Sequence, residues 1–270
     1  MKPLKFKLLP VSILFLLLSA LNINAQISEK DQAHYDSKTS EAINEWTGSV
    51  NHNWTNSGNW SLGSVPISSD DVIIPGGTPN QPFIYSGTTA TCNDIVIQSG
   101  AVLTQEGTSY FRVYRHFNSD NGQFVMSSVS SYLYFDGTSS NYWDDDNMND
   151  IYSNVRVDKD LSTATTTMWQ DMTLQGGAYS AFSIREGEFA IDAEWELTVL
   201  GTTDGALTVE NGGKLTLDQN QDVTVSGGIV FEDGSQLENI QGSIRCGGNF
   251  RVEANAAYDI HFGYNSWLFM

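Results

Sequence analysis

From about Thr91 onward, apolar and polar residues alternate along the chain in short runs that end at Gly, Asn or Asp. Clear examples are Ile95–Ile97, Phe111–Tyr114 and Tyr132–Phe135. A period of two over about four to six residues is typical of a β-strand, because successive side chains of a strand point to opposite faces. No stretch after residue 25 has a convincing helical period. The pattern therefore predicts an all-β protein built from short strands.

Four segments in the second half of the chain repeat the same order of features. Each has a strand, a Gly turn, a second strand, a turn in which Glu precedes Gly or Asn, and a third strand. The segments begin at Met172, Leu197, Val223 and Ile244, which are 25, 26 and 21 residues apart, and Ile95–Leu103 resembles an earlier, less regular copy. A period of ~20–50 residues is typical of repeat arrays, whose units cannot bury a core alone. Three short strands per unit favour one coil of a parallel β-helix.

The predicted fold is a right-handed parallel β-helix with a Trp-rich N-terminal cap. Coils of such a solenoid stack about 4.8 Å apart, so inward residues should form apolar ladders. We expect those ladders to include Leu207, Val209, Leu215, Leu217, Val223, Val225 and Phe231. The alternative is an antiparallel β-sandwich, whose turn signals also recur every ~8–12 residues. A sandwich, however, does not require the same phrase of strands and glycine turns to recur.

The patterns divide the chain into four parts. Residues 1–25 form a signal peptide, residues 26–45 a flexible polar leader, residues 46–90 a Trp-rich N-terminal capping module and residues 91–270 the coils. A solenoid needs a cap over its last coil. No polar cap is visible at residues 264–270, so we expect the front portion of a longer protein that is truncated at its C-terminus, rather than an aberrant cap.

The first 25 residues have the order of an export signal. Lysines at positions 2, 5 and 7 precede an apolar run over residues 8–21, and Ala25 offers a small residue for cleavage. The run is shorter than the ~20 residues that span a bilayer, which argues against the alternative of an uncleaved membrane anchor. No later stretch is apolar enough to span a membrane as a helix. We expect a secreted, extracellular protein, either released or attached to the cell surface.

The chain is strongly acidic. It has 13 basic and 32 acidic residues, a net charge of -19. Removal of the signal peptide leaves 10 basic residues and changes the net charge to -22. Such a surface repels phosphate backbones, so nucleic acid is not an expected partner.

Two cysteines, Cys92 and Cys246, are the only thiols of the chain. They lie several coils apart in the predicted fold, which is too far for the ~4–7 Å that a disulfide requires. We expect both to be small buried residues.

Two stretches together resemble a known kind of protein. They are Trp46-Thr-Gly with Trp54, Gly58-Asn-Trp60, Pro66 and Asp70–Pro75, and then Cys92–Thr104. They resemble the opening module and first coil of large secreted β-repeat proteins of Bacteroidetes-type bacteria. The resemblance implies an adhesin-like parallel β-helix, and such proteins often end in a sorting domain for the type IX secretion route. It specifies an architecture better than a ligand.

Three tryptophans in this stretch, Trp46, Trp54 and Trp60, are candidate glycan-binding residues. An aromatic face suits the C–H side of a sugar ring. The alternative is that they cover the first coil, since the end of a solenoid must be covered.

An acidic run follows Tyr142-Trp143 and is a candidate calcium site, since hard cations bind several oxygen ligands. The candidate ligands are Asp144, Asp145, Asp146, Asn147, Asn149 and Asp150. The run lacks the loop glycine of an EF-hand, and its twelfth position from Asp145 is Arg156 rather than Glu. A solvated loop is the alternative.

The function we expect is that of a non-catalytic structural or adhesin-like repeat protein that binds glycans or cell-surface components. The alternative is a carbohydrate-active β-helix enzyme, a polysaccharide lyase or glycoside hydrolase, which would need paired acids. The acids at equivalent places of the repeat are Glu186, Glu210, Glu232 and Glu253. Their regularity favours a surface acid ladder or a turn role over one catalytic site, so no catalytic residue is assigned.

Overall fold

The computed structural model describes residues 43–145, 152–176, 180–192, 195–253, 260–262 and 267–269. All of them belong to one compact unit, Ala42–Met270. The predicted signal peptide and the leader up to residue 42 lie outside the described residues. The last residues that the sequence places in the leader, Ile43–Glu45, form strand β1.

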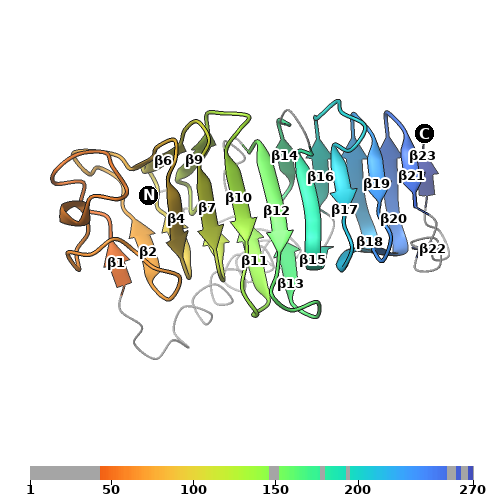
Figure 1. Ribbon diagram of the computed structural model, residues 1–270, viewed down its shortest axis with the longest axis horizontal. Coiled ribbons are helices and arrows are strands. Elements are labelled where there is room, and N and C mark those ends of the chain that lie inside the picture. The colour runs from red at the N-terminus through yellow and green to blue at the C-terminus, as the bar shows by residue number, and fades with distance from the viewer. Residues whose placement is uncertain are drawn as a thin grey trace, which may run out of the picture. The chain divides into compact units, whose positions relative to one another are not determined.

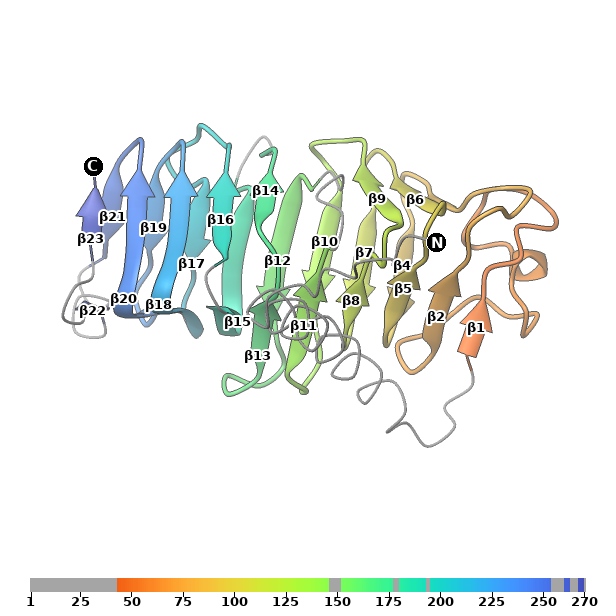
Figure 2. The same cartoon turned by 180° about the vertical axis from the view of Figure 1, so that it is seen from behind.

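The unit is a β-solenoid in which strands of successive coils lie side by side (Figure 1 and Figure 2). Within the described residues, every pairing between strands is parallel. A β-sandwich is built from antiparallel pairs, so the β-helix prediction is confirmed and the sandwich alternative is wrong. Each coil passes through three faces in a fixed order, which we call sheets I, II and III.

Sheet I faces the viewer in Figure 1. It contains β4 (Thr89–Cys92), β7 (Tyr110–Val113), β10 (Tyr132–Phe135), β12 (Asn154–Asp158), the first part of β15 (Phe182–Ile191), β17 (Leu207–Val209), β19 (Ile229–Phe231) and β21 (Phe250–Val252).

Sheet II continues each coil after a turn or a bend. It contains β1, β2 (Asp71–Ile74), β5 (Ile95–Ile97), β8 (Phe117–Asn118), β11 (Asn141–Asp144), β13 (Thr165–Met168), the second part of β15, the first parts of β18 (Gly213–Val225) and β20 (Gln236–Cys246), and β22 (Ile260–Phe262).

Sheet III closes the coil. It contains β3 (Phe83–Ile84), β6 (Val102–Gln105), β9 (Gln123–Met126), β14 (Met172–Leu174), β16 (Glu196–Val199), the second parts of β18 and β20, and β23 (Trp267–Phe269).

The repeat read from the sequence is the repeat of the fold. Met172 pairs with Leu197, Leu197 with Val223, and Val223 with Ile244. The four segment starts therefore stack in register on sheet III. The unequal spacing along the chain is absorbed in the turns and bends between sheets.

The predicted apolar ladders are correct in part. All seven residues are fully or almost fully buried, and Val209 pairs with Phe231 in sheet I. Val223 and Val225, however, do not stack on Leu207 or Leu215: they pair with Leu197 and Val199 in sheet III. The reason is a corner inside β18, where the register shifts between Gln219 and Asp222 and the strand crosses from sheet II to sheet III.

The tryptophan-rich stretch forms an aromatic cluster in the N-terminal part of the solenoid. Trp46, Trp54 and Trp60 are 0%, 0% and 3% exposed and belong to the same hydrophobic core as the coils. The ring centroids of Trp46 and Trp60 lie 5.0 Å apart and those of Trp54 and Trp60 lie 4.7 Å apart, both edge to face. Trp54 also meets Phe111 of sheet I at 5.5 Å. A short 3-10 helix, η1 (Ser57–Asn59), lies between Trp54 and Trp60.

Candidate binding surface on the exterior of sheet I

Successive side chains of β7, β10 and β12 point in turn to the core and to the exterior, although neighbouring side chains cover the outward Tyr134 to 6% exposure. On β7, Phe111 and Val113 are buried while Tyr110 and Arg112 are partly exposed. The register pairs Tyr110 with Tyr132, and Arg112 with Tyr134. It then pairs Tyr134 with Arg156 of β12. Parallel stacking thus collects a set on the exterior, which we call the Tyr–Arg ladder: Tyr110, Arg112, Tyr132, Tyr134 and Arg156.

Rings and guanidinium groups are in contact throughout the Tyr–Arg ladder. The rings of Tyr110 and Tyr132 are stacked, with centroids 5.7 Å apart and planes 18° apart. The Arg112 Cζ lies 4.3 Å from the Tyr134 ring centroid, and the Arg156 Cζ lies 4.7 Å from that of Tyr132. These distances are within the range of cation–π attraction. Burial raises the pKa of the Tyr134 phenol, although the charge of Arg156 opposes the rise, so the phenol remains protonated at neutral pH.

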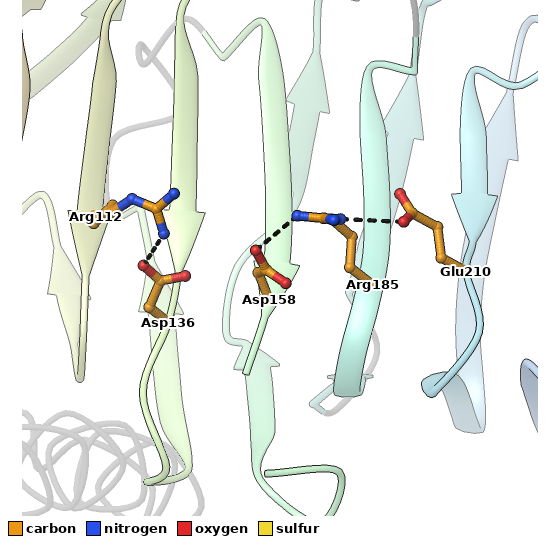
Figure 3. A network of polar contacts seen from close by, with 5 residues as sticks. All are labelled: Arg112, Asp136, Asp158, Arg185 and Glu210. Atoms are coloured by element: carbon orange, nitrogen blue, oxygen red, sulfur yellow. Dashed lines mark hydrogen bonds and ion pairs between the residues drawn. The ribbon is translucent and has the colours of Figure 1, made fainter. Parts of the chain in front are cut away.

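A row of carboxylates borders the ladder. Asp136, Asp158 and Glu210 each directly follow a buried residue of sheet I. The Nη1 of Arg112 lies 2.6 Å from the Oδ2 of Asp136. Arg185 bridges two coils, with 2.9 Å to the Oδ2 of Asp158 and 3.1 Å to the Oε2 of Glu210. Figure 3 shows Arg185 between these two acids and Arg112 directed at Asp136. Burial raises the pKa of the Asp136 carboxyl, and the hydrogen bond and charge of Arg112 offset part of that rise.

The position of Arg185 results from a β-bulge. Val157 pairs with Ile184, but Asp158 pairs with Glu186, so Arg185 is the extra residue of β15. A bulge redirects a side chain locally, and here it places a cation in a row of acids. Glu186 was expected to lie at the place equivalent to Glu210, but the structure instead places Arg185 beside Glu210.

The other three acids do occupy equivalent places. The backbone N–H groups of Glu210, Glu232 and Glu253 each donate to the preceding coil, at the carbonyls of Ile184, Val209 and Phe231. Burial raises the pKa of the Glu232 carboxyl, and the charges of Glu210 and Glu253 raise it further. The expected surface acid ladder is therefore present from β17 to β21.

A shallow pocket opens beside this acid ladder. Its volume is about 200 Å³. It is lined by Asp204, Gly205, Thr208, Val230, Glu232, Asn249 and Arg251. Polar side chains supply most of the lining, which suits a hydroxyl-rich ligand better than an apolar one.

A buried lysine directly follows β12, between the strands of the Tyr–Arg ladder and those of the acid ladder. Lys159 is 1% exposed, and its Nζ donates to the carbonyl oxygen of Asp136 at 2.8 Å. Burial lowers the pKa of Lys159 to about 8. Gly187, with φ of +84°, leaves room for the chain of the lysine, because a Cβ there would lie 2.7 Å from the lysine Cγ.

The predicted glycan-binding tryptophans lie apart from this surface and inside the core. Their indole faces contact other rings, and the Nε1 of Trp46 donates to the carbonyl oxygen of Asn80 at 2.7 Å. Glycan binding by these residues stays a prediction, and it would require the sugar to displace part of the cluster.

The predicted calcium site falls only partly within the described residues. Asp144 and Asp145 are 7% and 3% exposed, and the hydroxyl of Ser119 donates to Asp145 at 3.2 Å. Asp146, Asn147, Asn149 and Asp150 lie outside the described residues. In the part of the chain that can be described, no three His, Cys, Asp or Glu side chains are grouped as metal ligands. Calcium binding at this run stays a prediction.

Both cysteines have the predicted state: Cys92 and Cys246 are buried and unbridged. Within the described ranges, no helix has the length and apolar content needed to cross a membrane.

Sequence reasoning missed the Tyr–Arg ladder. The signal was present in the outward positions of strands already recognised at Phe111–Tyr114 and Tyr132–Phe135. Those positions become neighbours only once the spacing between coils is known, and Arg156 had been considered only as the residue that departs from a calcium loop at its twelfth position.

One family model matches the chain. Residues 45–172, just under half of the 270 residues, are similar to a family described as a domain of unknown function (DUF8693). The match runs from the end of β1 to the start of β14, so it includes the tryptophans and the Tyr–Arg ladder but neither Arg185 nor the pocket. No curated protein and no solved structure matches the chain.

Proposed function

We propose that this protein is a secreted or cell-surface, non-catalytic, adhesin-like repeat protein that binds glycans on the exterior of sheet I. The observation that carries the proposal is the Tyr–Arg ladder, in which the partly exposed rings of Tyr110 and Tyr132 and the guanidinium groups of Arg112 and Arg156 are held by contacts across three coils. Aromatic faces suit the C–H side of sugar rings, and guanidinium groups donate to sugar oxygens.

The solenoid suits an extended ligand. Outward side chains of neighbouring strands recur about every 4.8 Å along the solenoid axis. A glycan lying along that axis would therefore meet one coil after another. Several weak contacts along one glycan chain combine into a higher overall affinity. The polar pocket beside the acid ladder would add a further contact.

We further propose that the chain is exported by Bacteroidetes-type bacteria and reaches the type IX route. The support is the order of charged, apolar and small residues in positions 1–25 and the resemblance carried by Trp46–Pro75. Expression with its own leader in such a host should yield an extracellular protein that begins at Gln26. A cell-associated protein that retains Met1 would contradict export.

A glycan array followed by calorimetry tests the binding proposal. Tyr132→Ala should weaken binding about tenfold, which corresponds to ~1.4 kcal/mol. Tyr85→Ala is the matched control, because Tyr85 is 39% exposed and its ring is stacked on Phe83 at 5.7 Å and 19°, directly after β3 of sheet III rather than on sheet I. Equal losses in both variants, or no glycan bound by the wild type, would contradict the proposal. Cleavage of any bound polysaccharide would favour the enzyme alternative.

A further inference from the structure

Arg156 differs from the other arginines that the structure describes. Each of the others lies within 3.8 Å of a carboxylate oxygen: Arg112, Arg115, Arg185, Arg245 and Arg251. Among the described residues, no acidic side chain pairs with Arg156, and its buried Nε has no hydrogen-bond partner. In a chain of net charge -19, a guanidinium without an acid is unexpected.

The surroundings of Arg156 hold its guanidinium in place without neutralising it. Its Cζ lies 4.7 Å from the ring centroid of Tyr132 and 5.8 Å from that of Tyr134. The nearest outward acids already engage other cations: Asp136 is bound by Arg112, and Asp158 by Arg185. Because these carboxylates are engaged, the partly exposed Arg156 is a cation of sheet I that can accept an external anion.

We propose that Arg156 binds the carboxylate of an acidic sugar, with Tyr132 packed against the same sugar or its neighbour. The proposal rests on the glycan-binding function proposed above and names its ligand class. A guanidinium donates two parallel hydrogen bonds to the two oxygens of one carboxylate, a geometry that an ammonium cannot reproduce.

The charge of the rest of the molecule limits which acidic glycans can bind. Carboxylates surround the site on sheet I, and the acid ladder continues from β17 to β21. A polymer with a charge on every sugar would be repelled along this surface. The fitting ligand therefore has one carboxylated sugar flanked by neutral sugars, whether that sugar is a hexuronic acid or a sialic acid.

Calorimetric titration of the full chain tests the inference with matched ligands. The probes are a xylo-oligosaccharide bearing one glucuronic acid, its methyl ester, and sialyllactose. The acid should bind, the ester should bind at least tenfold more weakly, and sialyllactose shows which source of the carboxylate the site accepts. Arg156→Gln should weaken binding of the acid at least tenfold and leave binding of the ester unchanged.

Two further variants act as controls. Arg156→Lys keeps the positive charge and the ring contact but not the paired hydrogen bonds, so it should also bind the acid more weakly. It replaces Arg156→Gln as the test if Arg156→Gln does not fold. Arg245→Gln removes a positive charge on sheet III and should change nothing. Equal binding of acid and ester, or full affinity in both Arg156 variants, would overturn the inference while leaving glycan binding intact. Binding of none of these saccharides and of no glycan on an array would overturn the proposed function as well.

Discussion

The N-terminal and C-terminal coils of sheet I share an interior and differ in their exterior. Inside, Phe111 of β7 and Phe231 of β19 are both fully buried in continuous apolar ladders. Outside, β7 to β12 carry the Tyr–Arg ladder, whereas β17 to β21 are followed by glutamates. Parallel stacking fixes only which positions are neighbours. The fold therefore requires apolar residues at the inward positions, whereas the residues at the outward positions can differ between coils and serve ligand binding.

The largest effect should come from the shared interior. Phe111→Ala and Phe231→Ala remove fully buried rings from two neighbouring ladders of sheet I, so each should lower the free energy of unfolding by about 3–5 kcal/mol. Urea denaturation followed by circular dichroism measures both. Arg251→Ala, an outward substitution, should change stability by less than about 0.5 kcal/mol. A small effect at one phenylalanine and a large one at the other would show that the two regions do not share one kind of core.

The next largest effect is the pH dependence of stability caused by Lys159, which lies between the Tyr–Arg ladder and the acid ladder. Its pKa is lowered to about 8, below the ordinary 10.5. Between these values the unfolded chain binds more protons than the folded chain, so this group makes stability rise as pH increases from about 8 to about 10.5. The full change is on the order of 3 kcal/mol, since one pKa unit corresponds to about 1.4 kcal/mol.

Denaturation midpoints at pH 7, 9 and 10 measure this dependence. Lys159→Met is the control, because it removes the titrating amine and keeps the aliphatic contact with Gly187. The variant should lose the rise that the wild type shows. A wild type and variant with parallel pH profiles would contradict the account of Lys159.

Arg185 separates the two exteriors, so charge reversal should extend the acidic region toward the ladder. Arg185→Glu removes ion pairs with Asp158 and Glu210 and adds a like charge. The side chain is 39% exposed, so solvent limits the loss of stability to about 1 kcal/mol. Arg245→Glu, which reverses a cation paired at 3.5 Å on sheet III, is the matched control for net charge. Glycan affinity should fall in the first variant and not in the second.

The smallest effect belongs to the acid ladder alone. The folded-state pKa of Glu232 is raised by burial and by Glu210 and Glu253, so the folded chain holds its proton more tightly than the unfolded chain. Stability from this group is present at low pH and lost as pH rises through that window. Glu232→Gln should therefore stabilise the protein by a few tenths of a kcal/mol at pH 7, and less in high salt. A destabilised variant at pH 7 would contradict the ladder's mutual repulsion.

Much of the fold could be predicted from the sequence because glycine turns and period-two alternation mark each coil. Met172, Leu197, Val223 and Ile244 were aligned by these marks and do stack in register. The corner inside β18 carries no such mark, which is why Val223 was assigned to the wrong ladder. The bulge at Arg185 is equally silent, since a bulge depends on the register of the neighbouring strand.

The candidate surface was harder to predict for a related reason. Tyr134 and Arg156 are 22 residues apart and become neighbours only through the register of β10 and β12. The tryptophans drew attention because Trp is a common glycan platform, but a solenoid also needs large apolar residues at its end. Composition alone does not report burial, so the sequence left both roles open.

The exterior of sheet I is the surface that we propose binds the glycan. Hydroxyl-radical footprinting of the wild-type protein, with and without a glycan selected from an array, tests this without any substitution. The ligand should protect Tyr110 and Tyr132, while the oxidation of Tyr85, which follows β3 of sheet III, should be unchanged. Protection of Tyr85 with full oxidation of Tyr132 would place the ligand elsewhere and contradict the account.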